Sequence, residues 1–188
     1  MRTRRLVALA LTVLTGGARS GKSAAAVAAA AGSGAPVTFV ATAESGDEEM
    51  AERIAQHRAR RPAHWTTLEA TQDLLRAVGA VDPADTIIVD CLAIWATNRM
   101  LEDPRPADTD IEAEAARLAR ALAARPGLAL VVTNEVGSGV VPATPLGREF
   151  RDLLGCVNQA LVRAADTAYL VVAGRLLPLV DPASGLQA

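Results

Sequence analysis

The sequence predicts an α/β domain with a mostly parallel sheet and helices on both of its faces. Apolar runs rich in Val, Ile and Leu alternate along the chain with segments of helical character, an order typical of doubly wound folds. The apolar runs lack polar alternation, which indicates strands buried on both faces. A glycine-rich segment joins the first run to an alanine-rich helix, as in folds that hold phosphate groups.

The bulk composition favours one globular domain. The chain has 188 residues, enough for a substantial core, and 51% of them are hydrophobic. We expect a single catalytic domain over residues 1–188, with loose ends at 1–5 and 181–188. The net charge of −2 gives no general basic field for nucleic acid. Aromatic residues make up only 3%, too few for a base-stacking surface.

The N-terminal segment and the two cysteines indicate where in the cell the protein is expected. MRTRRLVALALTVLTGGA imitates a secretory signal, but cleavage there would remove the first strand or cut into the glycine-rich motif. Its apolar run is also too short to cross a membrane. Cys91 and Cys156 form no CxxC pair, so neither a zinc site nor a disulfide scaffold is indicated. We expect a cytoplasmic protein without a membrane span.

Short apolar runs bounded by turn residues locate the strands, and longer stretches between them locate the helices. The expected strands are Leu6–Leu14, Val37–Ala41, Thr86–Val89, Leu128–Thr133 and Ala168–Val172. The expected helices are Ser23–Ala31, Glu48–Arg60, Leu68–Val78, Leu92–Met100, Ile111–Ala124 and Leu146–Ala165. The proline- and aspartate-rich segment Glu102–Asp110 predicts a surface loop.

The segment GGARSGKS satisfies the phosphate-binding pattern G-x-x-x-x-G-K-[ST], and it stands between a strand and a helix as that motif requires. Glycines let backbone N–H groups surround phosphate oxygens at a helix N-terminus. Lys22 supplies a charge to the β and γ phosphates, and Ser23 Oγ can bind Mg²⁺. The residues expected to contact nucleotide here are Gly16, Gly17, Ala18, Arg19, Ser20, Gly21, Lys22 and Ser23.

A second magnesium ligand is expected at the end of another buried strand. TIIVD ends in Asp90, which matches the acidic residue that follows a hydrophobic strand in proteins with this loop. The alternative is an ordinary aspartate at a strand end or helix cap. The sequence therefore predicts a magnesium site made by Ser23 and Asp90.

The stretch MAERIAQHRARRPAHW predicts a short basic helix that ends near Arg61, because Pro62 follows. Helical spacing places Arg53 one turn before His57 and Arg61 one turn after it. Neighbouring positive charge favours a neutral imidazole, the form that can attack phosphorus. The alternative is a histidine on a helix face that only hydrogen-bonds a neighbour.

Five segments together resemble one enzyme family. They are TGGARSGKS, ATAESGDEEMAERIAQHRARRPAHW, VDC, TNEVGSGVVP and FRDLLGCVNQALVRAAD. The resemblance is to the adenosylcobinamide kinase / adenosylcobinamide-phosphate guanylyltransferase family, and it extends from about Thr12 to Val172. The patterns RIxxHxxxRP and NEVGxGxVP are the most distinctive.

This resemblance implies a RecA-like parallel sheet, typically in a trimer, and a role in cobalamin biosynthesis. The family phosphorylates the aminopropanol hydroxyl of adenosylcobinamide with ATP or GTP. It then transfers GMP from GTP to that phosphate through a guanylylated histidine, giving adenosylcobinamide-GDP and pyrophosphate. The RIxxHxxxRP pattern places the histidine on His57, whereas His64 lies outside the pattern.

The resemblance also implies roles for residues beyond the glycine-rich loop. The expected catalytic residues are His57, Lys22, Arg53 and Arg61, the arginines stabilising charge on the phosphoryl oxygens. Glu69 matches a nucleotide-contacting position and could accept from the guanine edge; the alternative is an exposed helix carboxylate. The further residues expected to contact nucleotide are Thr42, Ala43, Glu44, Arg58, Arg60, Arg61, Glu69 and Asp90.

Three positions depart from the family pattern. The helix after the glycine-rich loop is AAAVAAAA, without the usual glutamate; Ser138 stands where methionine is usual; and Cys156 stands where arginine is usual. None of these is His57 or Lys22. The departures leave open a chain that retains only the guanylyltransferase activity.

Two other classes of protein remain as alternatives. One is a different small-molecule kinase with the same loop and no covalent intermediate. The other is a RecA-like ATPase that acts on a protein or nucleic acid, for which the best argument is the cluster Arg53, Arg58, Arg60 and Arg61. That cluster is short, is balanced by nearby glutamates and lacks the support of aromatics or a basic pI, and most such charge runs are solvated helix faces.

Overall fold

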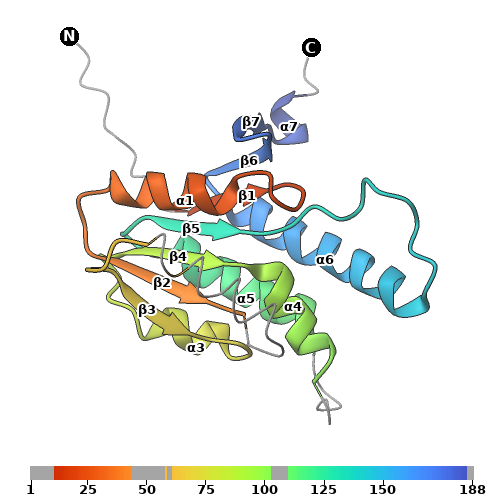
Figure 1. Ribbon diagram of the computed structural model, residues 1–188, viewed down its shortest axis with the longest axis horizontal. Helices are drawn as coiled ribbons and strands as arrows, with labels where there is room; N and C mark the ends of the chain where they lie inside the picture. The colour runs from red at the N-terminus through yellow and green to blue at the C-terminus, as the bar shows by residue number, and fades with distance from the viewer. Residues whose placement is uncertain (1–10, 44–57, 59–60, 103–109, 186–188) are drawn as a thin grey trace.

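The computed structural model describes residues 11–43, 58, 61–102 and 110–185 (Figure 1). Its strands are β1 (Leu11–Thr15), β2 (Val37–Ala41), β3 (Thr66–Glu69), β4 (Thr86–Asp90), β5 (Ala129–Val132), β6 (Thr167–Val172) and β7 (Arg175–Leu179). Its helices are α1 (Lys22–Ala31), α3 (Leu74–Gly79), α4 (Leu92–Met100), α5 (Ile111–Ala123), α6 (Pro145–Ala164) and α7 (Pro182–Gly185). The strands form one sheet in the order β3-β2-β4-β5-β1-β6-β7.

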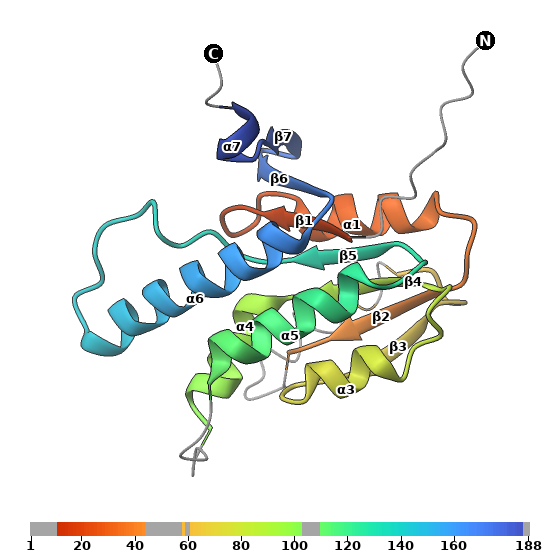
Figure 2. The same cartoon turned by 180° about the vertical axis from the view of Figure 1, so that it is seen from behind.

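All neighbouring strands of the sheet are parallel except β6 and β7, which form an antiparallel pair. Helix α1 covers one face, and α3, α4, α5 and α6 cover the other (Figures 1 and 2). The central strands are buried on both faces, and Leu11, Val13, Ile87 and Val131 have no solvent exposure. The predicted fold class is confirmed, and the reason is the one expected: strands without polar alternation lie between two helical layers.

The parallel arrangement brings several strand ends to one edge of the sheet. In the pairing register Ala41 lies opposite both Glu69 and Asp90, and Asp90 lies opposite Val132. The glycine-rich loop leaves the sheet at the same edge, directly after β1. Ligands of open α/β sheets bind at this carboxyl edge, so the topology collects the predicted site residues there.

Most predicted elements are confirmed to within two residues, but the helix predicted over Leu68–Val78 is wrong at its start. Residues Thr66–Glu69 form β3, parallel to β2, and the helix begins only at Leu74. The β-branched pair Thr66 and Thr67 suits a strand. Asp73 then caps the helix, because its side chain accepts a hydrogen bond from the Arg76 N–H at 3.1 Å.

Strand β7 and the short helix α7 were not expected. Ala173 and Gly174 have φ of 49° and 75° and form a tight turn between β6 and β7. Two successive positive φ angles are typical of the two-residue turns that join antiparallel strands. Pro178 is accommodated because β7 is the edge strand.

Some expectations lie outside the described residues. They include Leu6–Ala10 of the first strand and nearly all of the helix expected over Glu48–Arg60. Within that helix Arg58 is helical, and the Arg61 N–H donates to its carbonyl at 3.1 Å before the chain bends. Both cysteines are free thiols. In the described parts of the chain, no helix is long and apolar enough to cross a membrane.

Candidate active site

The glycine-rich loop is held in place by close backbone contacts. Gly16 has φ of 149°, and a Cβ there would lie 2.4 Å from the Val171 carbonyl oxygen of β6. Gly21 has φ of 103°, and a Cβ there would lie 3.1 Å from Gly174 Cα. The Gly174 N–H also donates to the Ser20 carbonyl at 2.8 Å. Backbone conformation therefore favours glycine at both loop positions, and at Gly16 a steric clash also excludes a side chain.

Lys22 lies inside the loop that it closes. Its Nζ donates to the carbonyl oxygens of Gly16 and Gly17 at 2.8 and 2.7 Å, and the residue is only 6% exposed. Burial lowers the pKa of the ammonium group, while Cys91 and Asp90 act in the opposite direction. Helix α1 begins at this residue, so the charge lies beside free helix N–H groups. Loop, lysine and helix terminus together make an anion site.

Ser23, Asp90 and Arg61 line a single pocket of about 240 Å³ beside the loop. Its remaining described lining residues are apolar: Ala24, Val27, Ala28, Ala31 and Phe39. Ser23 and Asp90 bring a hydroxyl and a carboxylate to this lining. Mg²⁺ prefers oxygen ligands and is often held by only one or two protein groups together with phosphate and water. The two residues therefore fit the magnesium ion expected from the sequence.

Arg61 projects its guanidinium over the ring of Phe39, at 3.5 Å from the ring centroid. Its one hydrogen bond to a described residue is a long one, from Nη1 to Thr67 Oγ1 at 3.4 Å, and its buried Nε has no described partner. Burial lowers the pKa of Arg61, and the neighbouring Asp90 carboxylate opposes this effect. A guanidinium stays charged in such surroundings, so a cation with spare donors stands at the pocket.

Thr42 joins the ends of β2 and β4. It has no solvent exposure; its hydroxyl donates to the Cys91 carbonyl at 2.8 Å and accepts from the Cys91 N–H at 2.9 Å. Asn98 of α4 donates to the carbonyls of Thr42 and Thr71 at 3.0 and 2.9 Å. The hydroxyl of Thr42 is thus engaged in holding Asp90 and its neighbour Cys91 at the carboxyl edge.

The other predicted residues fall into two groups. Glu69 ends β3 and is exposed, Ala43 is half-buried in the loop after β2, and Arg58 is exposed. Glu69 therefore stands on a strand end and not on a helix, contrary to the alternative considered for it. The second group lies outside the described residues: Glu44, Arg53, His57 and Arg60.

Several residues at the site were not singled out from the sequence. Phe39 was hidden within an apolar strand, although an aromatic residue on β2 near a basic segment is a signal for stacking. Glu135, after β5, donates its N–H to the Gly16 carbonyl at 3.0 Å. Asn158 of α6 accepts from Thr133 Oγ1 at 2.6 Å and donates to the Asn134 carbonyl at 2.9 Å. The TNEVG segment is thereby fixed against the glycine-rich loop.

The departures at Ser138 and Cys156 lie outside the lining of the pocket beside the glycine-rich loop. The backbone N–H of Ser138 donates to Glu135 Oε1 at 3.1 Å, a contact that any side chain at 138 permits. Cys156 lines a separate groove between α5 and α6 with acidic neighbours such as Glu112 and Asp152. Neither position contributes to the pocket beside the glycine-rich loop.

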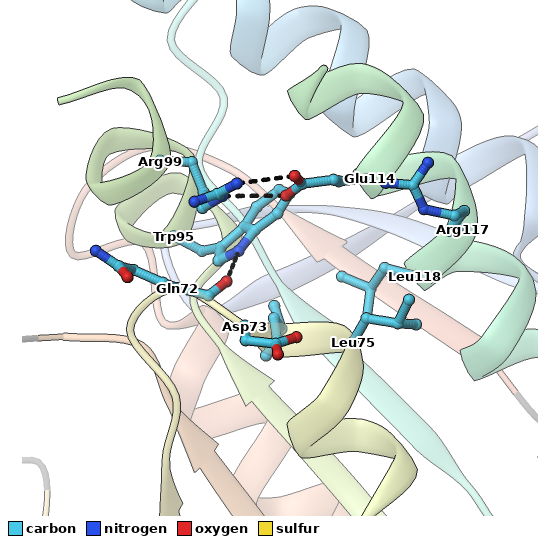
Figure 3. Close-up of a pocket in the computed structure, with 9 residues that line it drawn as sticks. Gln72, Asp73, Leu75, Trp95, Arg99, Glu114, Arg117 and Leu118 are labelled. Carbon is cyan, nitrogen blue, oxygen red and sulfur yellow. Dashed lines mark hydrogen bonds and ion pairs between the residues drawn. The ribbon is translucent and has the colours of Figure 1, made fainter. Parts of the chain in front are cut away.

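A further pocket of about 340 Å³ lies between α3, α4 and α5, on the face opposite α1 (Figure 3). Its polar groups largely satisfy one another. Arg99 makes a paired contact with both carboxylate oxygens of Glu114, at 2.8 and 3.1 Å, and also bonds Glu102. Trp95 Nε1 donates to the Gln72 carbonyl at 2.7 Å. These contacts tie α4 to α5 and to the loop before α3.

A strand, a glycine-rich loop with a buried lysine, a helix and an acid at a nearby strand end define a P-loop nucleotide-binding protein with a RecA-like sheet. Two solved structures show the same fold. A RadB recombinase matches with a TM-score of 0.50 at 17% identity, over 86% of this chain and 73% of its own. An ATPase of a bacterial type III secretion system matches with a TM-score of 0.51 at 13% identity, over 85% and 50%.

The sequence narrows this class to a family. Residues 12–179 match the family described as cobinamide kinase / cobinamide phosphate guanyltransferase. A bifunctional adenosylcobalamin biosynthesis protein of Pseudomonas aeruginosa is 43% identical over 89% of this chain and 95% of its own length. Its counterparts in Escherichia coli and Salmonella typhimurium are 40% and 41% identical, each over 87% of this chain and 96% of its own.

The chain belongs to the cobinamide kinase / cobinamide phosphate guanyltransferase family, as its motifs predicted. It is a bifunctional transferase of cobalamin biosynthesis. This membership decides against the two rival classes, an unrelated small-molecule kinase and an ATPase that acts on a macromolecule. The likeness to a recombinase and a secretion ATPase is one of fold alone.

Proposed function

We propose that the P-loop holds the triphosphate for both reactions and that His57 carries GMP between them. In the kinase reaction, ATP or GTP gives its γ-phosphoryl group to the aminopropanol hydroxyl of adenosylcobinamide. In the transferase reaction, GMP passes from GTP to the resulting phosphate and yields adenosylcobinamide-GDP. Lys22 neutralises the β and γ phosphates in each case.

The observation that supports this proposal most is the convergence of Ser23, Asp90 and Arg61 on one pocket beside the P-loop. Arg61 also ends the segment that contains His57. Four residues of chain span at most about 14 Å, at up to about 3.6 Å per residue. Connectivity therefore limits the distance between the Cα atoms of residues 57 and 61 to about 14 Å.

The covalent step begins with a neutral imidazole. Nε2 of His57 attacks the α-phosphorus of GTP, a nitrogen–phosphorus bond forms, and the bond to the pyrophosphate oxygen breaks. Arg61, whose terminal nitrogens have few described partners, stabilises charge on the phosphoryl oxygens as it develops. A phosphate oxygen of the acceptor then attacks the same phosphorus, and the histidine leaves as neutral imidazole. Two easier displacements replace one hard one.

Ser23 and Asp90 would hold the magnesium ion that accompanies the nucleotide. A divalent cation there supplies charge neutralisation for the phosphate oxygens. Lys22 and Arg61 then provide the positive charge that comes from the chain itself, one at the P-loop and one across the pocket. Glu69 and Ala43, at adjoining strand ends, are proposed to contact the nucleoside, and Glu69 can accept hydrogen bonds from a guanine edge.

The labelling test uses GTP labelled at the α-phosphate, with Mg²⁺ and no corrinoid. The wild-type chain should acquire acid-labile, alkali-stable label that survives denaturing electrophoresis. His57→Ala should acquire none, while the matched variant His64→Ala, which alters an exposed histidine outside the pattern, should label normally. Label that persists in His57→Ala and disappears in His64→Ala would move the role to His64. No label on a folded wild type that binds GTP would remove the covalent mechanism.

We also propose that the chain works as a homo-oligomer, with a trimer expected from the family. Large apolar side chains on two projecting segments support this. Val140 and Val141 are 96% and 61% exposed in the loop before α6, and Val180 is 71% exposed after β7. Exposed apolar side chains on such segments gain free energy when a partner subunit covers them. Light scattering on the purified chain should give three times the monomer mass, and a monomeric mass at micromolar concentration would contradict the proposal.

A further inference from the structure

The apolar lining of the pocket beside Ser23 is not explained by a nucleotide site alone. We propose that the pocket seats the aliphatic alcohol arm of the acceptor, the group that receives the γ-phosphoryl, and does not seat any part of the nucleotide. This inference rests on the kinase half of the proposed function. It locates the reacting end of the corrinoid on the face of α1.

The position of the pocket follows from the direction of the triphosphate. Lys22 and the magnesium ligands of P-loop enzymes meet the β and γ phosphates, not the nucleoside. Ser23 and Asp90 both stand on the wall of the pocket. A group placed in it therefore meets the γ end of the triphosphate, where an acceptor hydroxyl must approach in line with the breaking bond.

The chemistry of the pocket suits a short aliphatic group. Helix α1 contributes four apolar lining residues, Ala24, Val27, Ala28 and Ala31, and β2 contributes Phe39. The polar residues among the described lining are Ser23, Arg61 and Asp90. The helix that departs from the family pattern by its run of alanines thus contributes an apolar surface. A hydrocarbon chain ending in a hydroxyl suits such a mixed lining, with its alcohol toward the phosphate.

The size of the pocket restricts what enters it. Its volume of about 240 Å³ lies below the range of roughly 300–1,000 Å³ typical of pockets that enclose a whole drug-sized ligand. A corrin macrocycle is larger than such ligands, so only an arm of it fits. The ring system would remain outside the pocket.

Arg61 supports the inference because it lines this pocket and its guanidinium makes one long hydrogen bond to a described residue. Its guanidinium is stacked on Phe39 at 3.5 Å, and its Nε is buried without a described partner. A cation at the mouth of an acceptor pocket stabilises the phosphoryl group in transfer. The same side chain would otherwise be a costly desolvated charge with a single long hydrogen bond.

Two alanines on α1 give a matched test. Ala28 lines the pocket, whereas Ala29 is equally exposed on the same helix and does not. Binding of adenosylcobinamide is measured by equilibrium dialysis from the absorbance of the corrin, with Mg²⁺ and a non-hydrolysable GTP analogue present. Ala28→Leu should raise the Kd for adenosylcobinamide at least about tenfold, since a filled pocket excludes the arm. Ala29→Leu should leave it within about twofold. Both variants should bind the GTP analogue as the wild type does.

Two results would overturn the inference. A weaker affinity of Ala28→Leu for the GTP analogue would show that nucleotide occupies the pocket. Equal corrinoid affinity in Ala28→Leu and Ala29→Leu would show that nothing is seated there. Ala31→Leu, which fills the pocket from the other end of α1, gives the same contrast if Ala28→Leu unfolds. The labelling of His57 is independent of this contrast, so failure of the covalent mechanism leaves the dialysis result interpretable.

Discussion

Arg61 and Arg125 are both at least partly buried, but they lie at opposite edges of the sheet and differ in their hydrogen-bond partners. Arg125 precedes β5 at the amino edge and is 7% exposed. Its two terminal nitrogens donate to four backbone carbonyls, those of Val78, Val81, Asp82 and Asp85. Arg61 has one long bond to a described residue and a ring beneath it.

We propose that this difference separates a structural arginine from one that contacts a ligand. Burial lowers the pKa of both side chains, and the Nε of each lacks a described partner, so desolvation alone does not distinguish them. The hydrogen bonds donated by their terminal nitrogens do distinguish them, since Arg125 donates to four carbonyls and Arg61 to one described hydroxyl. The loops around Arg125 are also closely packed, since a Cβ at Gly127 would lie 2.4 Å from the Asp85 carbonyl. We therefore expect the amino edge to contribute stability and the carboxyl edge to carry the proposed chemistry.

The largest expected effect tests the carboxyl edge. Arg61→Met should lower kcat/KM for GMP transfer by about 100- to 1,000-fold, because it removes a donor to the developing phosphoryl charge. The free energy of unfolding should change by less than about 1 kcal/mol. Steady-state kinetics and urea unfolding measure the two quantities. Arg120→Met, at an exposed position of α5, serves as the control. A loss of stability without loss of rate would mean that Arg61, like Arg125, has a structural role.

The converse substitution tests the amino edge. Arg125→Met should lower the free energy of unfolding by about 3 kcal/mol, because buried carbonyls lose their donors. At a temperature well below the midpoint of unfolding, kcat and KM should match the wild type. Differential scanning calorimetry and kinetics on the same preparation decide this. An unchanged melting temperature together with a reduced kcat would contradict the claim that Arg125 at the amino edge contributes stability and not catalysis.

A smaller effect is expected at the ring beneath Arg61. Phe39→Leu should lower kcat about tenfold while Phe39→Tyr preserves it, since an arginine–ring contact contributes roughly 0.5–2 kcal/mol. In the double variant with Arg61→Met, the leucine should add almost nothing, because the two residues act as a unit. Additive losses in this cycle would mean that Phe39 contributes only to packing.

The smallest effect concerns the long hydrogen bond. Thr67→Val keeps the side-chain shape and removes the acceptor for Arg61 Nη1, which lies at 3.4 Å. A bond of this length is weak, so we expect kcat to fall only about twofold. A loss as large as that of Phe39→Leu would mean that Thr67, and not the ring, fixes the guanidinium.

The sequence was informative where a pattern encodes local geometry. The P-loop, the strand ending at Asp90 and the boundaries of β2 and α4 could all be predicted, because glycine spacing and apolar runs specify them directly. The strand β3 could not, because four residues of mixed polarity become a strand only by pairing with β2. Tertiary pairing overrode the helical pattern of the leucines that follow.

The arrangement of the site was less accessible than its members. The sequence identified Arg61 through the family pattern, but its stack on Phe39 joins residues 22 positions apart in different elements. The contacts of Gly174 and Glu135 with the P-loop join still more distant segments. Such juxtapositions depend on strand order, which no single segment encodes. The role of His57, which lies outside the described residues, stays a prediction.

The central claim is that this chain carries GMP on His57 and delivers it to a phosphorylated corrinoid. The most direct measurement isolates the α-labelled enzyme from free GTP, adds adenosylcobinamide phosphate and follows the label after rapid quenching. Loss of label from the protein at the rate of turnover, with equal gain in adenosylcobinamide-GDP, is the predicted result. Label that stays on the protein while product forms from fresh GTP would contradict the claim, because the modified histidine would then lie off the reaction path.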